Sequence, residues 1–135
     1  MKKENVLLSK SFDFALDILD FYKELKKNQH YDLASQVVRS GTSIGANIRE
    51  AQRAVSKKDF INKLGIALKE ADETEFWLQI LDKKIAEVDE NLFKKIDELI
   101  RLLVSIINSS KKIINTEIRN RSFKYQSKKI LNSTF

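Results

Sequence analysis

Apolar residues recur at spacings of three and four along most of the chain, which is the pattern of a helix with one buried face. They fall into four segments, of which the first covers residues 11–27 and the second residues 32–55. The third is the most regular, with the seam Phe60, Leu64, Ala67, Ala71, Thr74, Leu78, Leu81 and Ile85. The fourth begins near Asp89 and is expected to run for about 28 residues, roughly 42 Å of helix.

Short polar connections between these segments favour antiparallel neighbours, so the predicted fold is an all-α, antiparallel up-and-down four-helix bundle. Helix starts are predicted at Asp32, at Ser56 with Asp59, and at Asp89, whose side chains can cap the first helical N–H groups. The absence of Pro and the presence of only three Gly agree with a helical chain. The chain divides into a flexible N-terminus, the bundle and a basic C-terminal tail, at residues 1–10, 11–119 and 120–135.

The first, third and fourth segments carry more apolar positions than a single bundle core requires. A second copy of the chain would cover this surface, so homo-oligomerisation is predicted; the alternative is a wide core with a few exposed aromatic side chains. No cysteine is present, which excludes disulfides and thiolate chemistry. Because no long uncharged apolar run occurs, we expect a cytoplasmic protein with no membrane partner.

The formal net charge of +6 is concentrated at one end of the chain. Residues 1–110 are balanced, whereas residues 111–135 carry seven basic residues against Glu117 alone. Such an end is typical of contact with a phosphate backbone or with an acidic partner surface. The candidate nucleic-acid-binding residues are therefore Lys111, Lys112, Arg119, Arg121, Lys124, Lys128 and Lys129. Secondary basic candidates lie around the turn between the second and third helices, namely Arg49, Arg53, Lys57 and Lys58.

Small and polar residues interrupt the apolar pattern of the second and third helices. Gly41 and Gly45 lie four residues apart and so share one helix face, where they would permit close packing of a neighbouring helix. The polar residues are interpreted as a structural network that sets helix register and assembly, or alternatively as solvated side chains. The predicted network consists of Arg39, Asn47, Glu50, Glu70 and Glu73.

Enzymatic chemistry has little support in this sequence. His30 is the only histidine and is expected in the first turn, where a solvated side chain is the usual case. Glu70 and Glu73 lack the accompanying histidine of a di-iron bundle. We therefore expect no catalytic residue, no metal site and no cofactor.

The segment SIGANIREAQRAVSKKDFINKLGIALKEADETEFWLQIL resembles the 23S rRNA intervening-sequence proteins. Its matching positions are Ser43, Ile44, Asn47, Ile48, Glu50, Ser56, Asp59, Phe60, Glu70, Glu73, Trp77 and Leu78, with Gln36 and Arg39 upstream. The resemblance covers about residues 12–114; Gly45 and Ala51 stand where many members carry Pro and Gly. It implies a left-handed up-and-down bundle, a ring-like homopentamer, and kinship with the accessory variability determinant of diversity-generating retroelements, which binds nucleic acid and a reverse transcriptase.

The leading interpretation is a non-enzymatic homo-oligomer, with a pentamer favoured, that binds RNA or DNA backbone through its basic residues. Phe123 and Tyr125 lie among these and could stack on unpaired bases, or could instead dock against the bundle. The alternative is an oligomeric adaptor that recruits a protein such as a reverse transcriptase, without touching nucleic acid itself.

Overall fold

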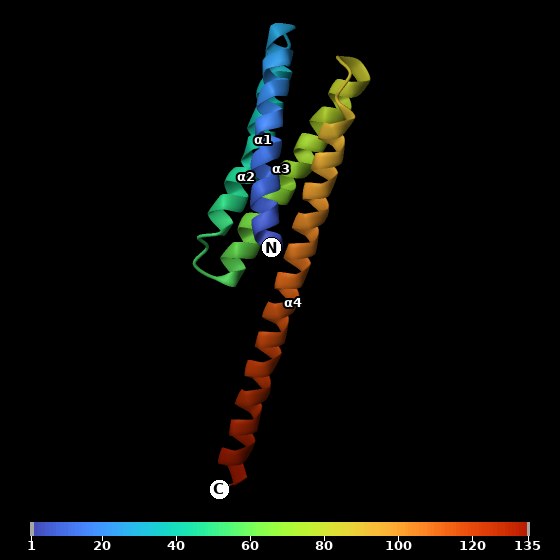
Figure 1. The fold of residues 1–135 in the computed structure, drawn as a ribbon. Coiled ribbons are helices and arrows are strands. Elements are labelled where there is room, and N and C mark those ends of the chain that lie inside the picture. The colour runs from blue at the N-terminus through green and yellow to red at the C-terminus, as the bar shows by residue number, and fades with distance from the viewer. Residues whose placement is uncertain (1, 135) are drawn as a thin grey trace.

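The computed structural model describes residues 2–134, and these form four α-helices and no strand. The helices are α1 (Lys3–Lys27), α2 (Tyr31–Ala51), α3 (Lys57–Lys84) and α4 (Glu90–Thr134). Each helix packs against the next along the chain, and α1 also packs against α4, which closes the bundle. Figure 1 shows α1, α2, α3 and the first half of α4 side by side, with the rest of α4 projecting beyond them. The predicted all-α chain of four helices is confirmed.

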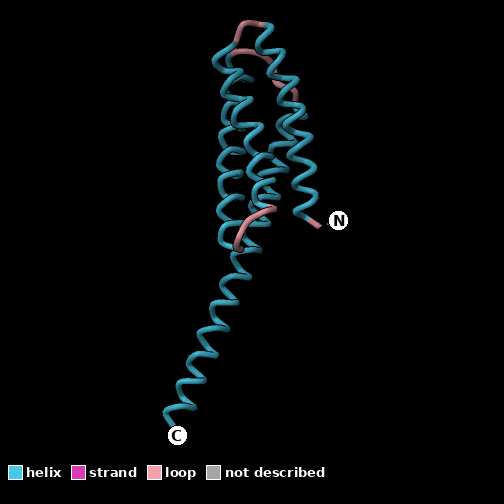
Figure 2. The backbone as a smooth tube through the Cα atoms, turned by 90° about the vertical axis from the view of Figure 1, so that its left-hand side faces the viewer, coloured by secondary structure: helices cyan, strands magenta, loops and turns pink. Residues whose placement is uncertain are grey.

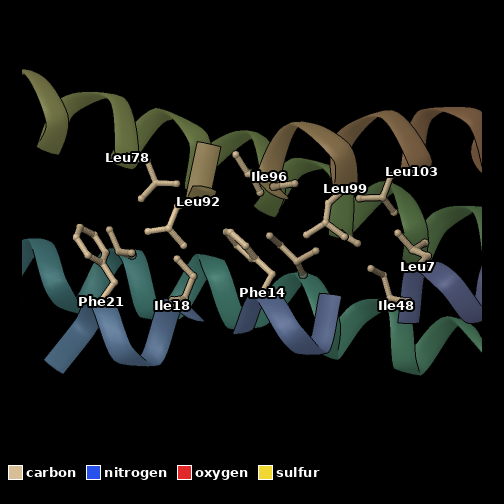
Figure 3. Close-up of a cluster of buried hydrophobic side chains, with 14 of the residues drawn as sticks. Leu7, Phe14, Ile18, Phe21, Ile48, Leu78, Leu92, Ile96, Leu99 and Leu103 are labelled. Carbon is tan, nitrogen blue, oxygen red and sulfur yellow. The ribbon is translucent and has the colours of Figure 1, made fainter. Parts of the chain in front are cut away.

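The core runs the length of the bundle and draws side chains from every helix. Phe14, Ile48, Leu78 and Leu103 are fully buried representatives of α1, α2, α3 and α4. Figure 3 shows the close interdigitation of these side chains across the bundle. Burying one such side chain contributes about 1.5–3 kcal/mol, so the apolar stripes read in the sequence are the main source of stability.

Two of the predicted helix caps form. The Asp59 N–H donates to the Ser56 hydroxyl over 3.0 Å, and the Asp59 carboxylate accepts from the Val55 N–H over 3.2 Å. At the start of α4 the Asn91 N–H donates to Asp89 Oδ1 over 2.9 Å. These bonds satisfy helix N–H groups that have no partner within their own helix.

The cap predicted at Asp32 is wrong, because α2 begins at Tyr31 and His30 occupies the N-cap position without a side-chain bond. The reason is a compact turn after α1. The His30 N–H donates to the Leu25 carbonyl over 2.9 Å, and Gln29 adopts a positive φ of 64°. This is the Schellman arrangement, which reverses the chain within a few residues. Asp32 then lies in the first turn of α2, where a carboxylate interacts favourably with the helix dipole.

The N-terminal boundary also differs from the prediction. Residues 3–10 were expected to be flexible, but α1 begins at Lys3 and Leu7 is only 1% exposed. The buried stripe of α1 runs from Leu7 through Ser11 to Phe14, and the polar Ser11 interrupts its apolar signal. The Ser11 hydroxyl is satisfied locally, since it donates to the Leu8 carbonyl over 3.0 Å.

Residues 120–134, predicted as a basic tail after the bundle, form the last part of α4, which continues as one helix to Thr134; Phe135 lies outside the described residues. The expected length of about 28 residues for the fourth helix is wrong, since α4 has 45. The sequence after Gly65 contains neither Gly nor Pro, so nothing in it stops a helix. Figure 2 shows this part of α4 continuing past the other three helices as a single rod. Among the residues described, no helix has the length and apolarity needed to cross a membrane.

Candidate nucleic-acid interface

The basic end of the chain is the part of α4 that leaves the bundle. We call residues 111–134 the α4 extension. Ile107, which is 7% exposed, is the last core residue of α4. From Lys111 to Ser133 every side chain is exposed except those of Ile114 and Ser127, which are half-buried. The extension is thus a single helix surrounded mainly by solvent.

All seven candidate residues of the basic end are exposed on the extension. They are Lys111, Lys112, Arg119, Arg121, Lys124, Lys128 and Lys129. None of them forms an ion pair with another described residue, so their charges are available to a ligand. A helix that carries unpaired cations and no neighbouring helix attracts polyanions.

The one acidic residue of the extension, Glu117, is engaged by the bundle. Its Oε1 accepts a hydrogen bond from Lys57 Nζ at 2.7 Å, across the gap between α4 and the first residue of α3. This bond lowers the pKa of Glu117 below its ordinary value, and the nearby charge of Arg121 acts in the same direction. The contact joins the base of the extension to α3 and pairs its one carboxylate with a cation.

The secondary candidates adjoin this base. Arg53, Lys57 and Lys58 lie at the turn between α2 and α3, and all three are exposed. Figure 1 places this turn at the end of the bundle from which α4 projects, and the Lys57–Glu117 bond joins the two regions. The two sets of basic residues, which the sequence offered as alternatives, therefore belong to one end of the molecule. Arg49 is exposed in the last turn of α2, directly before this turn, and also lines a groove between α1 and α2.

Part of the predicted polar network is present between α2 and α3. Arg39 Nη1 lies 3.2 Å from Glu70 Oε2, and Arg39 also pairs closely with Glu73. Trp77 Nε1 donates to Glu73 Oε1 over 3.3 Å. The hydrogen bond from Arg39 lowers the pKa of Glu73, with a further contribution from Trp77, and the same bond raises the pKa of Arg39. The Glu73 carboxylate is thus held ionised against the Arg39 guanidinium.

Asn47 and Glu50 do not join that cluster. Asn47 Nδ2 donates to the Ser43 carbonyl of its own helix over 2.8 Å, and Glu50 pairs with Lys63 at 3.3 Å. The sequence reading also missed a buried contact between the same two helices, in which the Thr74 hydroxyl donates to the Ser40 hydroxyl over 2.9 Å. The sequence does contain a sign of this contact, because Ser40 lies one turn before Ile44 on the buried face of α2.

Gly41 brings α1 and α2 close together, as predicted. A Cβ added to Gly41 would lie 2.9 Å from Ile18 Cγ2, closer than two carbon atoms can approach without displacement. A Cβ added to Gly45 would lie 3.4 Å from the Ser11 carbonyl oxygen, and Gly45 lines the groove between the two helices. The groove has a volume of about 700 Å³ and a mainly apolar surface, to which Leu8 and Phe12 contribute.

His30, the single histidine, is the N-cap residue of α2 and makes no side-chain cap bond. Within residues 2–134, no three His, Cys, Asp or Glu side chains gather closely enough to hold a metal ion. The chemically distinctive parts of the described chain are therefore the basic end, the Arg39 cluster and the α1–α2 groove.

The family model described as 23S rRNA-intervening sequence protein matches residues 3–109. Among solved structures, the chain is similar to a protein of unknown function from the S23 ribosomal protein family of Bacteroides thetaiotaomicron VPI-5482, with 47% sequence identity and a TM-score of 0.75. That similarity covers 79% of this chain and 99% of the other. No curated protein matches the chain. The family match ends before the α4 extension begins. The chain belongs to the 23S rRNA-intervening sequence protein family.

Proposed function

We propose that this protein is a non-enzymatic, cytoplasmic homo-oligomer that binds the phosphate backbone of nucleic acid through its basic end. The supporting observation is the α4 extension, a solvent-exposed helix with seven cations that have no ion-pair partner in the described chain. Its one carboxylate, on Glu117, is already occupied by Lys57. Each lysine or arginine that replaces a condensed counterion on the nucleic acid adds to affinity without reading sequence.

Self-association would multiply this effect, because several extensions would then reach one ligand. Support for an oligomer comes from Phe12, Leu16 and Leu19, which are 61%, 47% and 39% exposed. Their spacings of four and three place them along one side of α1, which we call the α1 stripe. A run of large exposed apolar side chains is typical of a protein interface. The number of five subunits rests on the family resemblance.

The same surface supports a second candidate function. The α1 stripe borders the α1–α2 groove, and a partner protein such as a reverse transcriptase could occupy both. In that role the protein would be an oligomeric adaptor, and the basic end would not be required for its interaction. The two candidates therefore make different predictions about the loss of charge on the α4 extension.

The decisive experiment compares two charge-reduced variants in equilibrium binding to structured RNA and duplex DNA at two salt concentrations. The extension variant replaces five bases with glutamine: R119Q, R121Q, K124Q, K128Q and K129Q. The matched control removes the same charge at the opposite end of the bundle: K23Q, K27Q, K83Q, K84Q and K94Q. All ten side chains are exposed, and none forms an ion pair within the part of the chain that the structure describes.

We expect the extension variant to bind at least about tenfold more weakly at low salt, with a shallower salt dependence, since each lost phosphate contact removes about one unit of slope. The control should bind within about threefold of the unmodified chain, because its charges lie more than a Debye length from the ligand. Equal loss in the two variants would contradict the proposal, and so would an unmodified chain that binds neither nucleic acid.

A further inference from the structure

The α4 extension has the dimensions of a helix that fits a DNA groove. Residues 111–134 form about 36 Å of helix at roughly 1.5 Å per residue, with a diameter near 10–12 Å. The major groove of B-form DNA is about 12 Å wide and admits one α-helix. No other helix of the described chain accompanies this rod beyond the bundle, so it is free to enter such a groove (Figures 1 and 2).

One side of the extension is entirely polar. Spacings of four, four, three, four and three place six exposed residues along one stripe, which we call the polar stripe. Its members are Lys111, Asn115, Arg119, Ser122, Gln126 and Lys129. None of these side chains has a hydrogen-bond or ion-pair partner among residues 2–134. The stripe therefore offers unused donors and acceptors as well as charge.

The arrangement of charged and uncharged side chains across the polar stripe matches the arrangement of phosphates and base edges across the DNA major groove. With about 100° of turn per residue, the uncharged Asn115, Ser122 and Gln126 lie along its centre. Lys111 and Lys129 fall on one edge and Arg119 falls on the other, with Lys112 and Ile130 just beyond Arg119. A helix in the major groove has base edges in front of it and a phosphate backbone on each side. Amide and hydroxyl groups suit base edges, and cations suit the two backbones.

Other ligands fit this helix less well. The six exposed large apolar residues of the extension form three pairs on different sides of the helix, so no single side gathers most of them for a protein groove. The pairs are Ile113 with Leu131, Ile118 with Tyr125, and Phe123 with Ile130. Phe123 and Tyr125 are two apart and also diverge, which does not give a platform for stacked single-stranded bases. Double-stranded RNA has a major groove too deep and narrow for side chains to read.

We infer that the α4 extension binds B-form duplex DNA by laying its polar stripe in the major groove. The inference rests on the proposed nucleic-acid binding and names the ligand class for it. It concerns a part of the chain outside the region shared with the family model, which ends at residue 109. A continuous helix that runs from an oligomerising bundle into the groove is an arrangement known from other DNA-binding proteins.

The test measures fluorescence anisotropy with a DNA duplex of about 30 base pairs and an RNA duplex of the same sequence, using the full chain. Two variants lose equal charge from opposite sides of the extension. The edge variant is K112Q/R119Q/K129Q, and the back-face variant is R121Q/K124Q/K128Q. Glutamine keeps helix propensity close to that of lysine and arginine, and circular dichroism checks that both variants fold.

We expect the unmodified chain to bind the DNA duplex at least about fivefold more tightly than the RNA duplex, and the edge variant to lose at least about five times more DNA affinity than the back-face variant. Equal affinity for both duplexes, or equal loss in both variants, would overturn the groove inference and leave phosphate binding intact. A preference for the RNA duplex would also overturn it. If neither duplex binds, the proposed function fails together with the inference.

Discussion

Replacing Gly41 with alanine tests how tightly α1 and α2 are packed. The new methyl group would lie 2.9 Å from Ile18 Cγ2, 3.0 Å from Cγ1 and 3.4 Å from Cβ. Ile18 is fully buried and branched at Cβ, so its side chain cannot rotate away without meeting the rest of the core. The helices must therefore separate slightly, and every contact along the α1–α2 seam weakens.

Two opposing effects set the magnitude. Inserting a methyl group into a filled core costs about 1–3 kcal/mol. Alanine within a helix is more favourable than glycine by about 1 kcal/mol. The Gly41→Ala chain should therefore lose up to about 2 kcal/mol of unfolding free energy, which corresponds to a fall in melting temperature of up to roughly 8 °C for a chain of this size.

Gly65 provides the matched control, because a Cβ added there would meet nothing within 4 Å. Urea unfolding should show that Gly65→Ala is stabilised by about 0.5–1 kcal/mol through helix propensity alone. In an Ile18→Ala background, where both crowded γ-carbons are gone, Gly41→Ala should also become neutral or stabilising. If Gly41→Ala stabilises the unmodified chain as much as Gly65→Ala does, the close approach of α1 and α2 is refuted.

Three further perturbations probe other parts of the structure. Ser56→Ala removes the acceptor of the Asp59 N–H and should cost about 1 kcal/mol in urea unfolding, whereas Ser56→Asp should cost little. The pKa of Glu73 is lowered in the folded chain, so its stabilising effect is present above its ordinary pKa of 4.5 and lost as the pH falls through the lowered value. The melting temperature of the unmodified chain should therefore exceed that of Glu73→Gln at pH 7, and the two should converge as the pH falls below 4.5; a difference that stays constant down to about pH 3 would contradict the role of Arg39. Phe12→Glu places a charge in the α1 stripe and should shift the sedimentation coefficient towards that of a monomer; an unmodified chain that already sediments as a monomer at micromolar concentration would refute the oligomer.

The sequence predicted the number of helices and most of their boundaries because apolar spacing reports burial directly. Where a buried position is polar, that signal fails. Ser11 is 1% exposed yet reads as a surface residue, so the first turns of α1 were assigned to a flexible segment. Asp32 resembled a cap because the turn before it was read as longer than it is. The left-handed conformation of Gln29, which shortens that turn, carries no strong sequence signal in a residue other than glycine or asparagine.

For the candidate sites too, spacing along the sequence predicts only part of the arrangement. The spacing within each helix predicted that Glu70 and Glu73 share a face, and the structure shows that both pair with Arg39 of α2. It could not predict the choice that Asn47 makes, because an asparagine in a helix can bond to the carbonyl four residues earlier as readily as to a neighbouring helix. Which partner a polar side chain bonds to depends on the distance between neighbouring helices. Between α1 and α2 the contact of Gly41 with Ile18 sets that distance, and the spacing of residues along the sequence does not reveal it.

The end of the bundle and the start of the extension are encoded at one recurring position of α4. Every seventh residue from Phe93 is apolar through Ile100, Ile107 and Ile114, and the next two members of the series are Arg121 and Lys128. The helix continues because no residue breaks it, but the bundle cannot, since a cation at this position has no core to enter. Loss of apolar periodicity therefore marks the end of packing and not the end of the helix.

A short, positively charged helix alone in water is marginally stable, and an anionic groove would supply the contacts that the bundle no longer provides. On this reasoning, amide hydrogen exchange in residues 111–134 should be fast in the free protein and should slow when duplex DNA is added; unchanged exchange on saturation with DNA would place the binding surface elsewhere.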